Sequence, residues 1–528
     1  MAKVLVSDQI DQAGIEILRQ VAHVDECLGL TEKQLKEIIG EYEGLMIRSG
    51  TQVTSEVIAS ADKLRIIGRA GVGVDNVDVP SATKRGVLVV NSPGGNTIAA
   101  AEHALAMLLA VSRHIPQAHG STVNGGWDRK KYVGNELYKK VLGVVGLGKI
   151  GSHVAKVANA MGMEVIAFDP FLSEERAQQM QVKLTSLEDL FSQSDYVTLH
   201  LPRTSETENL VNEKLLSSMK SNARLVNCAR GGIIDELALF KALESGIIAG
   251  AALDVYAVEP LSSESPLRSL GDRLILTPHL GASTAEAQEN VAIDVAEQIR
   301  DVLLGLPARS AVNIPGLSAD VMERLKPNLQ LAETLGLLAM QLAGGQVNEL
   351  EIKLQGEFSN NPSQPIVIAT LKGLLTNALG EKINYVNASL EAKARGINLL
   401  EVKDQASKDF AGGSLQLTTR GQKGSHTITG TIFTDGDLRI TSIDDFPVNV
   451  SPSQYMLFMR HRDTPGIIGE LGSMLGEHNV NIASMQVGRK ILRGDAVMVL
   501  SVDETIPSEL LKSILGIKGI QEAYRVTL

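Results

Sequence analysis

Cysteine, positive charge and long apolar runs are scarce in this chain. Only two cysteines, Cys27 and Cys228, occur among 528 residues. They provide neither a disulfide framework nor a zinc-binding pattern, so we predict no metal site. The most apolar stretch, residues 99–111, contains Glu102 and His103, so no membrane span is expected. These absences indicate a globular protein of a reducing compartment that does not enter a membrane.

The charge balance and the length narrow the choice further. The formal net charge is −11, which disfavours broad electrostatic binding to nucleic acid. A chain of 528 residues exceeds the size of one hydrophobic core, so three or four domains are expected. The first residues, MAKVLVSDQI, have the pattern of a strand rather than of a signal peptide. We therefore expect a cytoplasmic protein, or a protein of the plastid stroma if a transit peptide has been removed.

Glycine is abundant, and its most informative occurrence lies in residues 141–169, VLGVVGLGKIGSHVAKVANAMGMEVIAFD. An apolar strand pattern precedes Gly146, Gly148 and Gly151, and a helical pattern follows them. A second strand ends at Asp169. The three glycines would allow a tight turn, approach of a pyrophosphate and close helix packing. Asp169 would accept hydrogen bonds from a ribose diol and repel a 2′-phosphate. This combination favours an NAD site over a merely structural glycine turn.

Strand and helix patterns alternate on both sides of this motif. Before it, strands are expected at residues 3–6, 45–47, 64–67 and 87–90, which predicts a small parallel sheet. The second strand of the motif is residues 165–168, and after the motif strands are expected at residues 196–199, 224–227, 250–255 and 274–276. Long helices are expected at residues 96–113 and 284–304. The fold class is α/β, with a doubly wound sheet of six or seven parallel strands in the larger lobe.

The remaining chain has a different character. Residues 307–315 have the composition of a linker. Residues 316–452 contain helices near 328–343 and 364–379 and a predicted hairpin at 427–443, whose turn is Thr434–Asp437. Residues 453–528 follow the order βαββαβ of a ferredoxin-like unit.

Three polar residues follow three consecutive strands of the larger lobe. They are Arg230, Glu259 and His279, and ligands of open α/β sheets bind beyond the carboxyl ends of strands. An arginine can bind a carboxylate with two hydrogen bonds, a histidine can move a proton, and a glutamate beside it can orient the ring. The set suits oxidation of a 2-hydroxy acid, although each residue alone has a structural alternative, such as a surface salt bridge or a loop.

Other strand ends leave alternatives open. The Gly71–Gly73 loop is either an anion-binding nest or a plain turn. Asp254 either reaches the nicotinamide amide or caps a loop. Cys228 and His200 are interpreted as structural residues.

Four motifs then occur in order: VVGLGKIG with Asp169, NCARGGIIDE, ALDVYAVEP and TPHLGAST. With them the chain resembles the D-2-hydroxyacid dehydrogenases. RSGTQVT and GRAGVGVDNVD are similar to the phosphoglycerate dehydrogenases within that family, in the long form with an intervening and an ACT domain. The resemblance implies two flavodoxin/Rossmann-like lobes. Residues 1–98 and 285–310 would form the substrate-binding lobe, 99–284 the NAD-binding domain, 316–452 an α+β intervening domain and 453–528 the ACT domain.

The resemblance also implies roles for individual residues. Arg230 would hold the substrate carboxylate, His279 would be the acid–base group and Glu259 its partner. The implied substrate-binding residues are Arg48, Ser49, Gly71, Val72, Gly73, Asn96 and Arg129. Arg129 and Lys131 would either contact the substrate phosphate from a neighbouring subunit or form a solvated basic turn. The implied cofactor-binding residues are Gly146, Gly148, Lys149, Ile150, Gly151, Asp169, Cys228, Ala229, Arg230, Asp254, His279, Gly281 and Ala282.

The implied reaction transfers hydride from C2 of 3-phosphoglycerate to NAD and begins serine synthesis, in a homodimer or homotetramer. Two alternatives are another enzyme of the family, such as a glyoxylate or hydroxypyruvate reductase, and an NAD-sensing corepressor. In similar ACT domains an amino acid binds between paired domains, which here implies His461, Asp463 and Asn481 as an L-serine site. The familiar pattern has Asn where this chain has Asp463. The alternative is an ACT domain that only holds subunits together.

Overall fold

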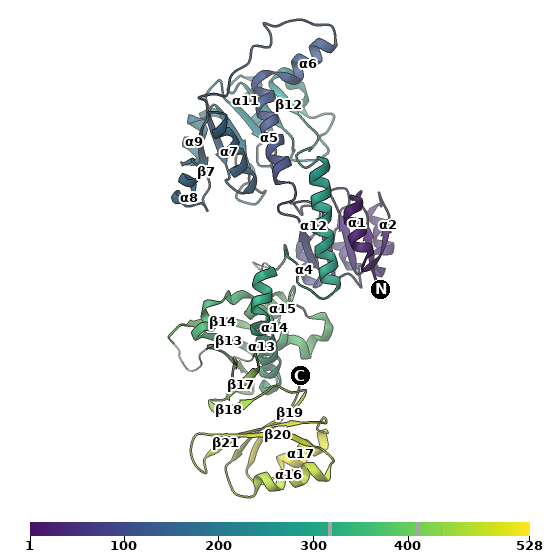
Figure 1. Cartoon of the computed structure of the whole chain (residues 1–528), viewed down its shortest axis with the longest axis vertical. Coiled ribbons are helices and arrows are strands. Elements are labelled where there is room, and N and C mark those ends of the chain that lie inside the picture. Colours follow the sequence, from purple (N-terminus) through teal and green to yellow (C-terminus); the bar gives the residue numbers. More distant parts are fainter. Residues whose placement is uncertain (315–318, 407–411, 434–435) are drawn as a thin grey trace.

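The computed structural model describes residues 1–314, 319–406, 412–433 and 436–528. Four sheets follow one another along an elongated molecule (Figure 1). We call the unit built on the first sheet the first lobe, and the next units the second lobe, the third unit and the fourth unit.

The first lobe contains a five-stranded parallel sheet in the order β2-β1-β3-β4-β5. Its apolar strands are buried on both faces, as expected for a parallel sheet covered by helices. The strands are β1 (Ala2–Val6), β2 (Ala22–Glu26), β3 (Gly44–Ile47), β4 (Ile66–Arg69) and β5 (Leu88–Asn91). The helices are α1 (Gln12–Arg19), α2 (Glu32–Ile38), α3 (Ser55–Ala59), α4 (Val79–Lys84) and the returning α12 (Ala285–Leu303), which packs on α1 and β4.

The second lobe contains seven parallel strands in the order β12-β11-β10-β9-β6-β7-β8, which confirms the predicted doubly wound sheet. The strands are β6 (Val141–Val145), β7 (Glu164–Phe168), β8 (Lys183–Leu184), β9 (Tyr196–Leu199), β10 (Arg224–Asn227), β11 (Gly250–Leu253) and β12 (Leu274–Leu276). The helices are α5 (Thr97–Arg113), α6 (Ile115–Val123), α7 (Lys149–Ala160), α8 (Glu174–Gln179), α9 (Leu187–Gln193), α10 (Glu213–Ser218) and α11 (Glu236–Glu244). The buried faces of α5 and α7 cover one side of the sheet, and those of α9, α10 and α11 cover the other.

The third unit contains a mixed sheet in the order β14-β13-β15-β16-β17-β18, in which only β13 and β14 pair in parallel. Its strands are β13 (Val347–Gln355), β14 (Asn398–Asp404), β15 (Ser414–Gly421), β16 (Gly424–Ile432), β17 (Leu438–Ile443) and β18 (Phe446–Val450). Its helices are α13 (Ala319–Ala343), α14 (Ser363–Leu379) and α15 (Ala388–Ala394). β16 and β17 form the predicted hairpin; its turn residues Thr434 and Asp435 lie outside the described residues.

The fourth unit contains an antiparallel sheet in the order β20-β21-β19-β22, the ferredoxin-like arrangement. Its elements are β19 (Tyr455–Arg462), α16 (Ile467–Glu477), β20 (Ile482–Arg489), β21 (Asp495–Val502), α17 (Ser508–Leu515) and β22 (Ile520–Thr527). One face of the sheet packs on both helices. The other face joins the core of the third unit through Met456, Phe458, Val497, Val499 and Val526.

Three sequence predictions need correction. β4 begins at Ile66 instead of residue 64, because Leu64 lies in a turn in which its N–H donates a hydrogen bond to the carbonyl of Ala61. β11 ends at Leu253, two residues early. The supposed linker is held on the first lobe up to residue 314: the N–H of Val312 donates to the carbonyl of Val89 at 2.7 Å. Several short elements were not predicted, among them the polar edge strand β2.

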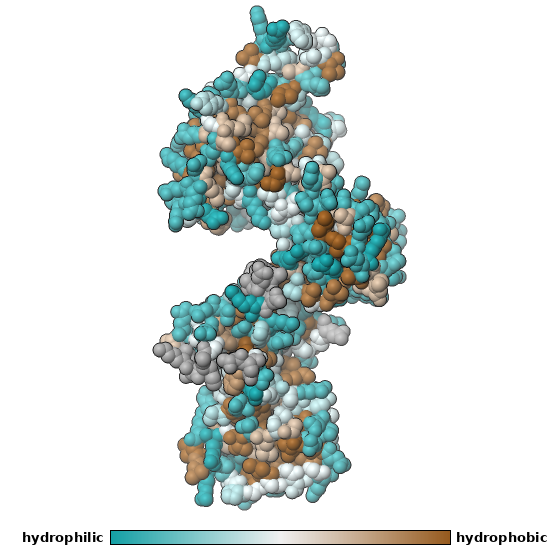
Figure 2. All heavy atoms as spheres, in the orientation of Figure 1, coloured by the Kyte–Doolittle hydropathy of each residue, from teal (hydrophilic) through white to brown (hydrophobic). Residues whose placement is uncertain are grey.

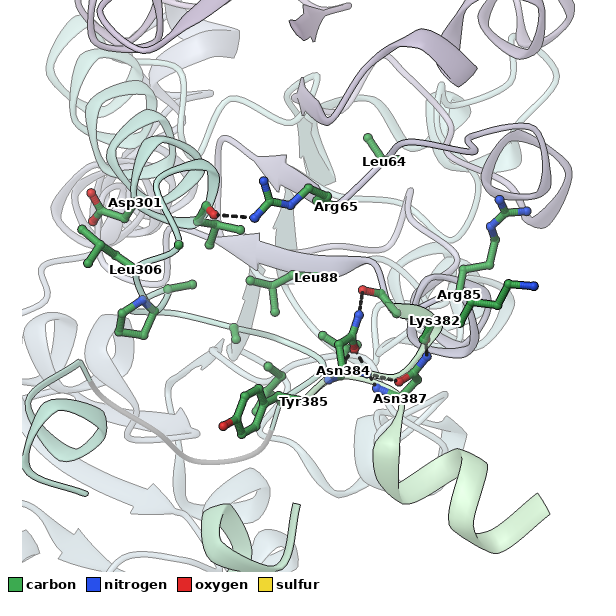
Figure 3. Close-up of a pocket in the computed structure, with 18 of the residues that line it drawn as sticks. Leu64, Arg65, Arg85, Leu88, Asp301, Leu306, Lys382, Asn384, Tyr385 and Asn387 are labelled. Carbon is green, nitrogen blue, oxygen red and sulfur yellow. Dashed lines mark hydrogen bonds between the residues drawn. The ribbon is translucent and has the colours of Figure 1, made fainter. Parts of the chain in front are cut away.

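A cavity of about 1700 Å³ separates the first lobe from the third unit (Figure 3). Arg65 and Leu88 line it at the beginnings of β4 and β5, so it lies at the opposite end of the sheet from the strand ends discussed below. Beside the cavity, the side-chain amide of Asn384 in the third unit donates to the carbonyl of Gly86 in the first lobe at 2.9 Å.

The helices do not individually have the features of membrane spans. No single described helix is long and apolar enough to cross a membrane; α5 and α6 reach the required length and composition only as a pair bent by 65°.

Candidate active site

The glycine-rich turn lies between β6 and α7, at the carboxyl end of the seven-stranded sheet. Gly146 has a φ of 93°, and a Cβ added to it would lie 2.6 Å from the carbonyl oxygen of His200. A Cβ on Gly151 would overlap the carbonyl oxygen of Gly146, so α7 packs directly against the turn. Gly148 has open space where its Cβ would be. The first and third glycines are thus required by the turn, and the second leaves room for a phosphate near the helix N-terminus.

Asp169 follows β7 and is hydrogen-bonded to the backbone beside this turn. Its Oδ2 accepts from the N–H of Leu147 at 2.8 Å, and its Oδ1 accepts from the N–H of Phe171 at 2.9 Å. These two bonds fix the carboxylate next to the glycines. Each carboxylate oxygen has a second lone pair for another donor, such as a ribose hydroxyl.

His279 and Glu259 form a hydrogen-bonded pair beyond β12 and β11. The Nδ1 atom of His279 lies 2.7 Å from Oε2 of Glu259, and Oε1 of Glu259 accepts from the N–H of Tyr256 at 3.0 Å. Burial raises the pKa of Glu259, but the bonds from His279 and Tyr256 outweigh it, so this pKa lies below its usual value. An ionised carboxylate only accepts, so Nδ1 carries the proton of the bond and Nε2 points away.

The backbone of His279 is unusual for a residue with a side chain. Its φ is 57°, in the left-handed region. Such a conformation costs about 1–3 kcal/mol and persists only where neighbouring contacts hold it. The side chain is 46% exposed, so the imidazole is accessible as well as constrained.

Asp254 supplies part of this support. It is fully buried, and its carboxylate accepts from the N–H groups of Leu280 and Gly281, both at 2.8 Å. Burial raises its pKa, but hydrogen bonds from His103, Thr277 and the backbone outweigh that effect and lower it. The carboxylate of Asp254 therefore caps the loop around His279, and its contact with the nicotinamide amide stays a prediction.

Arg230 reaches from the second lobe to the first. Its Nε lies 3.3 Å from Oδ2 of Asp75, and a Cβ on Gly73 would overlap its guanidinium. Gly73 and Asp75 belong to the loop after β4. Figure 2 shows a deep hollow beneath the second lobe, bordered by the first lobe and, below, by the third unit. β10, β11 and β12 are neighbours in one parallel sheet, so Arg230, Glu259 and His279 all lie beyond the same edge of that sheet.

Sequence reasoning missed Arg69, the last residue of β4. Its side chain folds under Gly71, where a Cβ would overlap the guanidinium, and its Nε is buried without a hydrogen-bond partner among the described residues. Burial, together with the positive charges of Arg230 and Arg48, lowers the pKa of Arg69 to about 10, despite opposing acids. Three guanidinium groups therefore repel one another here. The signal was present as Arg69 in GRAGVGVDN, directly before the glycines.

The predicted substrate residues Arg48, Ser49, Val72 and Asn96 lie in the loops that follow β3, β4 and β5. Oδ1 of Asn96 is buried without a hydrogen-bond partner in the described part of the chain, and Asn96 precedes α5 without capping it. The backbone N–H of Arg48 donates to Asp8, and Ser49 beside it is exposed. The carbonyl of Val72 accepts from the side chain of Asn91. These contacts leave the amide of Asn96 and the Arg48 side chain as further groups for a ligand.

The remaining predicted cofactor residues lie around the glycine turn and the strand ends. The Nζ atom of Lys149 lies 3.6 Å from where a Cβ of Gly94 would be, so this lysine bridges toward the first lobe. Ile150, the second residue of α7, packs against the core of the second lobe. The N–H of Ala229 donates to Asn227, and burial raises the pKa of the Cys228 thiol. Gly281 faces the carbonyl of Cys228, with half-buried Ala282 after it.

Arg129 is not part of this cluster within one chain. It is exposed, and its guanidinium lies 5.8 Å from the ring centre of Trp127, while Lys131 pairs with Asp272 at 3.0 Å. The segment after α6 projects at the top of Figure 1, away from the junction of the two lobes.

Comparison with known proteins decides the family. The D-3-phosphoglycerate dehydrogenase of Synechocystis sp. is 60% identical over 529 aligned residues, covering 100% of this chain and 95% of that protein. The protein of that name from Methanocaldococcus jannaschii is 43% identical, and all of both chains is covered. The chain belongs to the D-3-phosphoglycerate dehydrogenase family.

Family models match three parts of this family member. The NAD binding domain of D-isomer specific 2-hydroxyacid dehydrogenases matches residues 105–281, the D-3-phosphoglycerate dehydrogenase intervening domain residues 324–444, and the ACT domain residues 455–518. A D-lactate dehydrogenase from Aquifex aeolicus, solved with NAD and lactic acid, is 26% identical with a TM-score of 0.52, and covers 57% of this chain and 96% of its own. NAD is therefore the cofactor, and the open Gly148 and uncapped start of α7 fit it.

The three predicted regulatory residues of this dehydrogenase do not form one site within a single ACT domain. Asp463 follows β19 and accepts from Arg489 at 2.8 Å. Asn481 precedes β20 and donates to Asp503 at 2.6 Å. Because β20 begins opposite the end of β21 and ends opposite its beginning, Asp463 and Asn481 lie at opposite ends of the sheet. His461 is buried with Nε2 unpartnered among the described atoms.

Proposed function

We infer that this chain oxidises 3-phospho-D-glycerate to 3-phosphohydroxypyruvate with NAD, the reaction that begins phosphorylated serine synthesis. The observation that carries this inference is the position of Arg230. It lies beside the strands that present Glu259 and His279, and it meets Asp75 and the Gly71–Gly73 loop of the other lobe. The acid–base pair and the anion-binding arginines thus face one interlobe cleft.

The roles of the catalytic residues follow from their contacts. Arg230 holds the substrate carboxylate with two N–H groups. Nε2 of His279 takes the proton of the C2 hydroxyl on oxidation and returns it on reduction. Glu259 accepts from Nδ1 and so fixes the orientation of the ring. NAD, when bound on the glycine turn, supplies the hydride acceptor.

The substrate carries two anionic groups, a carboxylate and a phosphate. These two groups explain why three arginines, Arg48, Arg69 and Arg230, lie close together. Arg48 and Arg69 serve the group that Arg230 does not hold, and their mutual repulsion is relieved when an anion binds. The N–H groups of Val72 and Gly73 and the amide of Asn96 are the nearby uncharged donors. A glyoxylate or hydroxypyruvate reductase, whose substrates carry only one such group, would leave one arginine pair without a ligand.

The test compares three substrates at one NADH concentration. Oxidation of NADH with 3-phosphohydroxypyruvate should exceed oxidation with glyoxylate or hydroxypyruvate by at least about tenfold in kcat/KM, because a lost charge-assisted contact costs about 1.5–3 kcal/mol. Equal values would favour the reductase alternative, and no turnover with any of them would favour an NAD-sensing binding protein.

We also propose that L-serine controls the enzyme through paired ACT domains. β20 is an edge strand, and the exposed Val487, Ile491 and Leu492 lie in or just after it. Antiparallel pairing of two β20 edges would bring Asn481 of the partner subunit toward Asp463 and His461. This supports a homodimer or homotetramer in which two chains share each site. Arg129 and Lys131 would reach the substrate phosphate only from such a neighbour.

Two measurements test the regulatory proposal. Sedimentation at rising protein concentration should give a dimer or tetramer, and L-serine should reduce turnover. A monomer at micromolar concentration would contradict the shared site, whereas an oligomer indifferent to serine would leave a purely structural ACT domain. We propose the cytoplasm or the plastid stroma as the compartment of the enzyme. We also propose the predicted domain limits, for example residues 285 and 453, as the places where limited proteolysis should cut the chain.

A further inference from the structure

His103 is a half-buried residue of α5 that the proposed mechanism does not use. Its side chain is 19% exposed, and its Nε2 lies 3.2 Å from Oδ1 of Asp254, which is fully buried. The same nitrogen lies 3.5 Å from the hydroxyl oxygen of Thr277. α5 packs against β10, β11 and β12, the three strands that precede the catalytic residues. His103 therefore reaches from α5 to Asp254 and Thr277, which directly follow β11 and β12.

The contacts of Asp254 connect His103 to the catalytic loop. Oδ1 accepts from the hydroxyl of Thr277 at 2.5 Å and from the N–H of Leu280, and Oδ2 accepts from the N–H of Gly281. Residues 277, 280 and 281 flank His279 on both sides. A single buried carboxylate thus clamps the turn in which His279 has its left-handed backbone.

A buried carboxylate can hold this turn only if its own charge is well solvated by donors. Asp254 is ionised and acts only as an acceptor, so Nε2 of His103 carries the proton in their contact. Among the described residues, His103 is the side chain that brings a donor to Asp254 from outside the loops that follow β11 and β12. Its loss would leave Oδ1 with fewer donors and would weaken the hold of the carboxylate on Leu280 and Gly281.

We propose that His103 is a positioning residue for the reaction: through Asp254 it fixes residues 280–281 and so keeps His279 aimed at the substrate hydroxyl. The inference rests on the acid–base role of His279 in the proposed function. His103 itself needs no contact with substrate or cofactor. Its effect should therefore fall on kcat more than on KM for 3-phosphohydroxypyruvate, because the arginine cluster that binds the substrate stays intact.

The experiment compares three substitutions in the full-length enzyme. His103→Leu removes the donor, His103→Asn keeps a polar side chain that is too short, and His103→Gln places an amide N–H near the position of Nε2. We expect kcat to fall about tenfold in the first two variants, with KM changed less than threefold, and to recover to within twofold of the unaltered enzyme in His103→Gln.

A matched control is available on the surface. His23 pairs with Asp25 at 3.1 Å, as His103 pairs with Asp254, but it is 64% exposed and lies on β2, remote from the strand ends. His23→Leu should leave kcat unchanged. Thermal unfolding of every variant shows whether lost activity is lost folding.

The outcomes separate this inference from the proposed function. If the unaltered enzyme does not reduce 3-phosphohydroxypyruvate, the proposed function fails. If it does, and both His103→Leu and His103→Asn keep kcat within twofold, the positioning role is wrong. If His103→Leu does not fold, His103→Asn and His103→Gln still decide, because equal activity of these two would contradict a role that depends on the reach of the donor.

Discussion

The catalytic site and the serine site of the ACT domain were both predicted from short motifs. They differ in how many of their predicted residues a single chain brings together. In the cleft, residues 230, 259 and 279 follow three neighbouring parallel strands, so the sheet itself gathers them. In the ACT domain, Asp463 and Asn481 lie at opposite ends of an antiparallel sheet. Parallel topology brings successive strand ends to one edge, whereas alternating strands separate them. One chain therefore brings the three predicted catalytic residues to one edge, whereas the proposed serine site would need a second copy.

The largest expected effect tests whether the cleft is complete. His279→Ala removes the group that moves the C2 hydroxyl proton and should lower kcat by about 10²-fold or more. NADH binding, measured by fluorescence, should stay nearly unchanged, because the glycine turn and Asp169 are intact. A variant with near-normal turnover would show that another group moves the proton.

The next effect tests the arginine cluster that the sequence reading overlooked. Arg69→Gln should lower kcat/KM for 3-phosphohydroxypyruvate by about 30-fold, the scale of one or more lost charge-assisted bonds. The value for glyoxylate should change much less. Arg85→Gln, an arginine of the same lobe at the opposite end of the sheet, is the matched control. Equal losses for both substrates would assign Arg69 a structural role.

A moderate effect concerns the choice of cofactor. Asp169→Ala removes a carboxylate that would repel a 2′-phosphate, so the ratio of kcat/KM with NADP to that with NAD should rise about tenfold or more. Because Asp169 also accepts from Leu147 and Phe171, activity with NAD should fall somewhat as well. An unchanged ratio would mean that another residue selects NAD.

The smallest effect concerns the region that one chain leaves incomplete. The hydrogen bond and charge of Arg489 lower the pKa of Asp463, which accepts from that arginine at 2.8 Å. Asp463→Asn would release Arg489 and restore the familiar serine-binding pattern, so half-inhibition should need about threefold less L-serine. Basal kcat should not change. If neither form responds to serine while the oligomer persists, the ACT domain serves assembly alone.

The sequence by itself determined the features that depend on local spacing. The glycine turn, the acid at residue 169, the order of the motifs and the βαββαβ unit follow from periodicity and from residues that permit particular backbone conformations. The catalytic residues could be named because each immediately follows a strand of a parallel sheet. Their roles stay predictions until the variants above are measured.

Tertiary structure decided what depends on residues far apart in the chain. Arg69 contributes to the cleft because the second lobe brings Arg230, which stands 161 positions later in the sequence, close to it. Asp254 became a clamp because β12 returns beside β11, and His103 reaches it only because α5 packs over both strands. Sequence patterns report which groups stand at the end of a strand; only packing determines which of these groups meet, and whether a buried charge has donors around it.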